Sequence, residues 1–218
     1  MTYRFQAELK ADHLRAMSHL AAQKDIRYYL QGVMVFALPD VLLGATTGIV
    51  LGVLRTGQVA SARFQIRIPN TVLKQMGNAK GVVLLGSDDG ENWVLKVGPA
   101  TLGWKAEEER YPELHRALPA TVSGAAAKLD GRRLSLFYKT ADALGARDEH
   151  AVLVGHNGPD TALVSMPAVP DFIGGIAPLR SSPKHPEPAM VAPLWAKEPP
   201  AIPDNWRKAP AAETCDLA

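Results

Sequence analysis

Residues 25–54 read DIRYYLQGVMVFALPDVLLGATTGIVLGVL, and the spacing of apolar residues in this run gives the first indication of the architecture. Apolar and polar side chains alternate at the start of Ile26–Phe36, as in a half-buried β-strand. Two further strands are predicted at Val41–Ala45 and Val50–Leu54, with turn residues between them. Three strands in succession, with no helix between them, favour an antiparallel sheet.

A helix is predicted before these strands. Asp12 is a residue type that caps helix N-termini, and a weakly alternating strand at Tyr3–Leu9 precedes it. The apolar residues that fall on one face of this helix are Leu14, Met17, Leu20 and Ala21. The first unit of the chain therefore reads as a strand, a helix and three strands.

The same order of elements recurs in a second unit. A strand at Arg63–Ile68 leads into a short helix that starts after Pro69 and ends at Gly77. The inward face of this helix holds Val72, Leu73 and Met76. Strands follow at Gly81–Gly86, Trp93–Val97 and Thr101–Ala106.

A third unit begins near Thr121. Asp130 is placed to cap its helix, which Gly145 ends. The apolar face of this helix holds Leu134, Phe137, Ala141 and Leu144, and strands follow at Ala151–Gly155, Ala162–Met166 and Phe172–Ala177. The three helices start about 60 residues apart, which is the pattern of a duplicated unit. The fold class predicted is α+β, with each helix packed on antiparallel strands.

Composition excludes several classes of protein. The formal net charge is only +2, which is too small to indicate nucleic-acid binding by itself. The single cysteine, Cys215, rules out an intrachain disulfide and is expected in a reducing cytoplasm. The N-terminal residues have no apolar run of signal-peptide type, and the apolar stretch Val41–Leu54 is too interrupted to cross a membrane.

The C-terminal residues 181–218 are rich in proline, which breaks helices and sheet ladders. We expect a Pro-rich disordered tail there. It carries Trp195 and Trp206, which either dock on a partner or fold back on the body.

Four segments resemble the bacterial DNA sliding clamp, the beta subunit of DNA polymerase III, and they occur in the family's order. Asp25–Val35, DIRYYLQGVMV, is similar to the family's (D)(V/I)RYYLNG followed by an apolar strand, and Ala45–Gly52 resembles ATDGHRLA. Glu109–Pro119, ERYPELHRALP, is similar to (G)RFPDYRRVLP, and Gly175–Arg180 resembles the closing VMPMR. The resemblance covers residues 1–180.

A family clamp has three domains of two such units each, whereas this chain has three units. The resemblance therefore implies about one and a half clamp domains. Residues 1–119 match the family's middle domain, and residues 120–180 match the second half of its last domain. The function implied is that of a DNA-binding processivity factor in DNA replication, which tethers a polymerase to DNA. The alternative is a degenerate clamp-like interaction module that binds clamp partners without encircling DNA.

The clamp resemblance implies a surface for double-stranded DNA, contacted without reading its sequence. The residues expected to meet DNA are Lys10, Arg15, Lys24, Arg27, Tyr28, Tyr29, Lys74, Arg132 and Arg133, with Lys80, Lys128 and Lys139 nearby. The alternative is that these cations are ordinary surface residues and that the two tyrosines belong to the core.

The resemblance also implies an apolar pocket for short peptides of polymerases and other clamp partners. The matching residues are Leu30, Thr46, Gly48, Ile49, Val50, Leu51, Pro112, Arg116, Ala117, Ile176, Ala177, Pro178, Leu179 and Arg180. Two departures alter it: Ile49-Val50 replaces the family's His-Arg, and Ala177 and Leu179 replace two methionines. The alternative is that these residues form only the core between units.

No catalytic, phosphate-binding or dinucleotide-binding motif occurs, and the six histidines have no metal-ligand spacing. No enzymatic activity, cofactor or metal is therefore expected. The unpaired third unit is predicted to leave an open sheet edge and an exposed helix face at Leu134, Phe137 and Leu144. A second copy of the chain is expected to cover them, which makes a homo-oligomer the predicted state.

Overall fold

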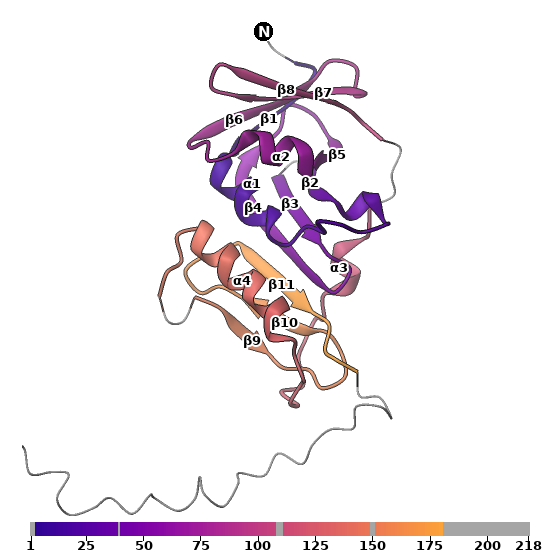
Figure 1. Cartoon of the computed structure of the whole chain (residues 1–218), viewed down its shortest axis with the longest axis vertical. Coiled ribbons are helices and arrows are strands. Elements are labelled where there is room, and N and C mark those ends of the chain that lie inside the picture. Colours follow the sequence, from indigo (N-terminus) through magenta and orange to yellow (C-terminus); the bar gives the residue numbers. More distant parts are fainter. Residues whose placement is uncertain (1–2, 39, 108–110, 149–150, 181–218) are drawn as a thin grey trace, which may run out of the picture. The chain divides into compact units, whose positions relative to one another are not determined.

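The larger sheet is built from strands of all three units (Figure 1). The computed structural model describes residues 3–38, 40–107, 111–148 and 151–180, all within one compact unit that ends at Arg180. The elements of the first unit are β1 (Phe5–Lys10), α1 (Ala11–Ser18), the 3-10 helix η1 (Tyr28–Leu30), β2 (Gly32–Leu38), β3 (Asp40–Thr46) and β4 (Val50–Val59). The predicted tail at 181–218 lies outside the described residues.

The second unit repeats this order. Its elements are β5 (Phe64–Pro69), α2 (Asn70–Met76), β6 (Val82–Ser87), β7 (Asn92–Val97) and β8 (Ala100–Lys105). After the short helix α3 (Leu114–Ala117), the third unit contains α4 (Gly131–Ala143), β9 (Leu153–Gly155), β10 (Ala162–Ser165) and β11 (Phe172–Ile176). The predicted three-unit α+β architecture is confirmed.

The first two units exchange their first strands. β1 pairs with β6, Phe5 opposite Ser87, and β5 pairs with β2, with Pro69 opposite Gly32. The exchange yields a four-stranded sheet, β1-β6-β7-β8, and a larger sheet, β5-β2-β3-β4-β11-β10-β9, with all pairings antiparallel. Neither unit is complete without the other, so residues 5–105 form one interlocked body.

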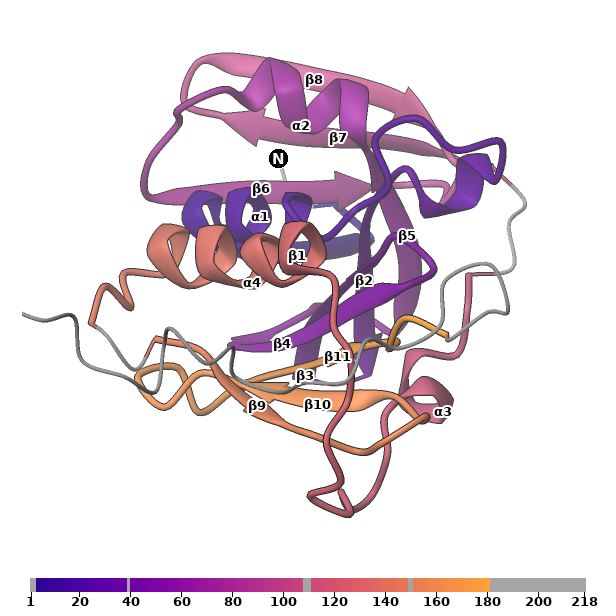
Figure 2. The same ribbon diagram turned by 60° about the horizontal axis from the view of Figure 1, so that its bottom comes forward.

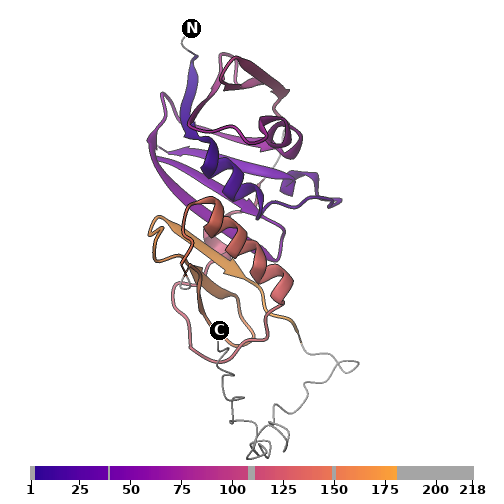
Figure 3. The same cartoon turned by 60° about the vertical axis from the view of Figure 1, so that its left-hand side comes forward.

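The third unit packs onto the first unit of the same chain. β11 pairs with β4, and α4 lies alongside α1, as Figures 2 and 3 both show. Phe137 of α4 is fully buried, and its ring meets that of Phe172 edge-on at 6.3 Å. The Thr140 hydroxyl donates to the Ala16 carbonyl of α1. The expected exposed helix face is therefore wrong for Phe137, because α1 and the sheet of the same chain cover it.

Two glycines sit opposite each other where β4 meets β11: Gly174 is paired with Gly52. A Cβ atom on Gly174 would lie 2.6 Å from Cε1 of Phe137, and one on Gly52 would collide with Leu20. The absence of side chains here lets the residues above the sheet sit directly on the junction.

Several local predictions are confirmed. Asp130 accepts a hydrogen bond from the backbone N–H of Arg132 and so caps α4. α2 begins after Pro69, with Val72, Leu73 and Met76 buried, and Gly77 follows it at a positive φ of 58°. In contrast, Asp12 lies in the first turn of α1 and caps nothing, since the N-cap position is Lys10.

The strand predicted at Ile26–Phe36 is wrong in its first half. Tyr28–Leu30 form the 3-10 helix η1, and the strand begins only at Gly32. Ile26, which the alternation placed on the apolar side of a half-buried strand, is 98% exposed. The side chain of Gln31 donates to the Asp25 carbonyl, which helps to hold this stretch as a tight turn instead of a strand.

The glycine junction gives a stability prediction. Gly174→Ala should lower the free energy of unfolding by about 1–3 kcal/mol, because the new methyl group overpacks against Phe137. Gly103→Ala in β8 is the matched control, since its nearest neighbour would be the Trp93 carbonyl oxygen at 3.8 Å. Urea unfolding of both variants measures the difference. Equal midpoints for the two would contradict a tight junction.

Candidate functional site

One face of the molecule is built by three helices side by side, α2, α1 and α4 (Figure 2). Their apolar faces are buried against the sheets, so their polar residues remain at the surface. The predicted cations that are exposed here are Lys10, Lys74 and Arg132, while Arg15 and Arg133 are partly buried. The structure thus brings predicted residues of all three units onto one helical face.

Most of the arginines on or beside this face are paired with carboxylates. Arg15 contacts Asp12 and donates to the backbone carbonyl of Ala79. Arg133 lies 3.5 Å from the carboxylate of Asp130. These ion pairs remove part of the positive charge of the face, whereas Lys10, Lys74 and Arg132 have no ion-pair partner among the described residues. Lysines are therefore the main source of unneutralised charge.

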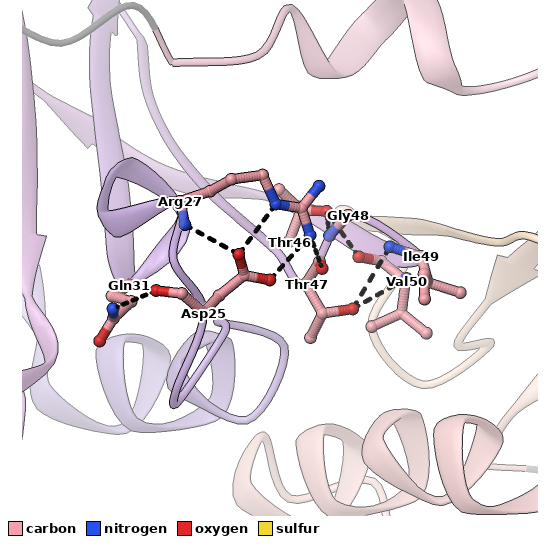
Figure 4. A network of polar contacts seen from close by, with 8 residues as sticks. All are labelled: Asp25, Arg27, Gln31, Thr46, Thr47, Gly48, Ile49 and Val50. Atoms are coloured by element: carbon pink, nitrogen blue, oxygen red, sulfur yellow. Dashed lines mark hydrogen bonds and ion pairs between the residues drawn. The ribbon is translucent and has the colours of Figure 1, made fainter.

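The loop between α1 and β2 carries the other predicted DNA residues, and Figure 4 shows its polar contacts. The Arg27 guanidinium binds both carboxylate oxygens of Asp25 and reaches the Thr47 carbonyl. Tyr28 is more than half exposed, and its ring meets that of Tyr29 edge-on. Lys24 is exposed and has no ion-pair partner in the described ranges. Arg27 thus braces the turn that follows β3, while Lys24 and Tyr28 face solvent.

The turn from Thr46 to Val50 is held by its own hydroxyl groups. Thr46 Oγ1 donates to the Val50 carbonyl and accepts from the Gly48 N–H. Thr47 Oγ1 accepts from the Val50 N–H. Gly48 adopts φ 85°, a left-handed conformation that favours glycine. The predicted pocket residues of this segment therefore form a rigid corner between β3 and β4.

The structure brings the two main pocket segments together. Ile176 pairs with Val50, and the Ala177 N–H donates to the Ile49 carbonyl at 2.8 Å. Leu30, Val50 and Ile176 are fully buried, so they form core and not pocket wall. Ala177 and Pro178 are half-buried, Leu179 and Arg180 are exposed, and Thr46 is buried.

A groove of about 1190 Å³ runs over the face of the seven-stranded sheet opposite α1 and α4. Its apolar lining includes Met34, Phe36, Leu42, Val53, Ile66, Ile173, Trp104, Ala106, Tyr111, Leu114 and Leu118. Of the predicted pocket residues it includes Pro112 and Arg116. Leu51 adjoins this lining, because its Cγ and the Cδ2 of Leu118 both lie over Gly175. Ala117, next to Arg116, is exposed.

Sequence reasoning missed most of this lining. The signal was present, since β2 and β3 are apolar on both faces: Met34 and Phe36 alternate with the core residues Val33 and Val35. A strand with apolar residues on both faces must be covered on both. Tyr111 and Leu114 supply part of that cover, and they pack on Met34.

The described residues hold no group of three or more His, Cys, Asp or Glu side chains placed to bind a metal ion. Among the same residues no helix is long and apolar enough to cross a bilayer.

The interlocked strand–helix–strand units and the attached third unit define the fold of DNA sliding clamps. Solved structures with this fold include DNA polymerase III subunit beta from Borrelia burgdorferi (13% identity, TM-score 0.62) and the sliding clamp from Pseudomonas aeruginosa (17%, 0.61). The Helicobacter pylori beta clamp bound to a DNA ligase peptide is also similar (10%, 0.65). Each match covers 83% of this chain and 64%, 67% and 66% of the other chain, respectively.

Comparison with protein-family models and with curated protein sequences finds no match. The predicted clamp fold is thus confirmed by structure at low sequence identity. The chain spans 64% of the length of the Borrelia protein.

The Asp25–Arg27 pair yields a pH prediction. Hydrogen bonds from the Arg27 side chain, and then from its backbone, lower the pKa of Asp25 from 3.8 to about 2. The pair stabilises the fold fully at pH values above the pKa of Asp25 in the unfolded chain, 3.8. This stabilisation is lost as the pH falls through the pKa of about 2 in the folded chain. NMR titration should show that midpoint, and Arg27→Gln should return it toward the ordinary value. A midpoint unaffected by the substitution would refute the pair.

Proposed function

We propose that this chain is a non-enzymatic, clamp-like protein of DNA replication that holds double-stranded DNA against its helix face and tethers a polymerase there. The observation that carries this proposal is the row α2, α1 and α4 on a sliding-clamp fold, where each helix or its flank has a cation with no ion-pair partner among the described residues. The boundary between a middle-domain-like part, 1–119, and a half domain, 120–180, belongs to the same proposal, as does a cytoplasmic location.

The chemistry of the helix face supports weak, sequence-independent contact. Lysine is a flexible point charge, so it neutralises phosphate without the bidentate geometry that reads base edges. Lys10, Lys74 and Lys80 stand on or beside two adjacent helices, and Lys139 and Arg132 stand on the third. Contacts of this kind release counterions and permit sliding.

A second candidate is an interaction module that binds clamp partners without encircling DNA. Ion pairing favours it, because Arg15, Arg27 and Arg133 all meet carboxylates and leave a reduced positive surface. The partner surface would be the groove together with the adjoining ends of β4 and β11. A peptide with leucine and phenylalanine anchors fits this apolar lining.

We also propose that the chain forms a homo-oligomer. The reason is now the free edges of the described sheets, because the helix face that was expected to be exposed is covered at Phe137. Among the described elements, β5 and β9 end the larger sheet and β1 and β8 end the smaller one. Edge strands pair readily with strands of another chain. Light scattering at several concentrations gives the solution mass. A monomer throughout would favour the interaction module, since a chain with three units cannot encircle DNA alone.

The DNA surface gives one prediction. Replacing Lys24, Lys74 and Arg132 together by alanine should weaken duplex binding on any sequence. The slope of log K against log salt should become shallower by about 0.9 for each phosphate that the variant no longer neutralises. Fluorescence anisotropy with two unrelated duplexes measures this. The control replaces Arg55 and Lys105, exposed cations on strands β4 and β8. Equal weakening in the two variants would argue against the helix face.

The groove gives another prediction. A peptide with Leu and Phe anchors should bind with micromolar affinity, about −8 kcal/mol. Val53→Glu should weaken it at least about tenfold, because a charge would then lie on the apolar floor. Val59→Glu is the matched control on the same strand, since Val59 is 70% exposed and outside the groove. Isothermal titration calorimetry measures the affinity. The same affinity for both variants would refute a peptide site in the groove.

A further inference from the structure

A second hollow, of about 720 Å³, lies between α1 and the C-terminal end of α4. Lys10 at the end of β1 and His13 on α1 line one part of it. Lys80, just before β6, and Lys139 on α4 line the rest, together with His19, which follows α1. The hollow therefore collects side chains from all three units at the helix face.

The carboxylates in this cleft are already neutralised. Asp12 is paired with Arg15, which also donates to the Ala79 carbonyl. Asp142 forms an ion pair with Arg147, with 2.9 Å between Oδ1 and Nε. Lys10, Lys80 and Lys139 have no ion-pair partner in the part of the chain that the structure describes. The cleft thus carries a surplus of three positive charges, which no described residue offsets.

Both histidines are partly buried in this positive environment. Burial lowers the pKa of His13, and Lys10 lowers it further while Asp12 opposes the shift. Burial also lowers the pKa of His19, with smaller contributions in the same direction from Lys139 and Arg15, and Asp142 opposes them. The Nδ1 atom of His13 is buried and makes no hydrogen bond to any described residue. A protonated ring, which donates from both nitrogens, is therefore disfavoured in the free protein.

We propose that this cleft binds phosphate groups of a nucleic-acid backbone, and that its affinity rises on acidification as His13 and His19 become positively charged. The inference rests on the proposed function, since its ligand is the DNA held by the helix face. A phosphate in the cleft lies among Lys10, Lys80 and Lys139, and its negative charge opposes the part of the pKa lowering that Lys10 and Lys139 add to the larger effect of burial. Binding and protonation therefore favour each other.

The direction of the effect follows from linkage. In the free protein the pKa of His13 and that of His19 lie below the ordinary value for histidine. A bound phosphate raises both pKa values, so the protein takes up protons on binding. Uptake of one proton strengthens binding up to tenfold for each pH unit of acidification. Each histidine that becomes a phosphate contact should also steepen the slope of log K against log salt by about 0.9.

The test is fluorescence anisotropy of a labelled duplex at several salt concentrations and at pH values from about 8 to about 5.5. The lower limit is set at about 5.5 because carboxylates begin to titrate below it. The wild-type chain should bind about tenfold more tightly at the acidic end. The variant His13→Gln/His19→Gln should match the wild type near pH 8 and lose the extra affinity below it. His156→Gln is the control, since His156 lies outside the cleft and accepts from the Ala127 N–H.

The outcomes separate this inference from the proposed function. Binding that depends on salt but not on pH, or a double variant that keeps the full pH dependence, overturns the cleft and leaves the DNA surface in place. No binding at any pH overturns both. If the double variant fails to fold, NMR titration of the His13 and His19 rings in the wild-type chain decides. Their pKa should rise when duplex is added, and an unchanged pKa rejects the cleft.

Discussion

The antiparallel pairing of β4 with β11 is the interaction on which the position of the third unit and the two candidate surfaces depend. It joins residues more than a hundred positions apart, and it places Gly52 opposite Gly174. Because neither glycine has a side chain, Phe137 and Phe172 of the third unit and Leu20 of the first fill the same layer above the sheet. A larger residue at either position would push α4 away from α1. The third unit would then lose the hydrophobic cover that makes it part of the body.

Both candidate surfaces are consequences of this junction. On one side of the sheet it sets α4 beside α1 and so creates the cleft that Lys10, Lys80 and Lys139 line. On the other side it aligns Val53 with Ile173, which together form part of the groove floor. The two surfaces lie on opposite sides of one sheet, so the two proposed ligands, a nucleic acid and a peptide, would not compete for the same residues.

The sequence predicted local structure well and long-range pairing poorly. Caps and breakers such as Asp130, Pro69 and Gly77 act within a few residues, so their effects can be read in order along the chain. The turn at Tyr28–Leu30 was misread as strand because alternation over five residues does not separate a strand from a tight turn. The covering of Phe137 was missed for a different reason. Nothing near α4 in the sequence indicates that α1 is its neighbour, and periodicity shows which face is apolar but not what covers it.

Most arginines at the helix face are ion-paired, whereas its lysines are not paired with any described residue, and this difference affects how the face could bind a ligand. Arg15 ties α1 to the residues after α2, Arg27 ties its loop to Thr47, and Arg147 is held by Asp142, so their planar, directional groups are used inside the structure. The lysines of the helix face have no such ties among the described residues. Arginine in a fixed pair cannot turn toward a phosphate without breaking that pair, whereas a lysine on a four-carbon stem follows a phosphate as it passes. A surface on which most arginines are fixed in such pairs, while the lysines and Arg132 have no ion-pair partner among the described residues, is therefore suited to contacts that form and break without regard to sequence.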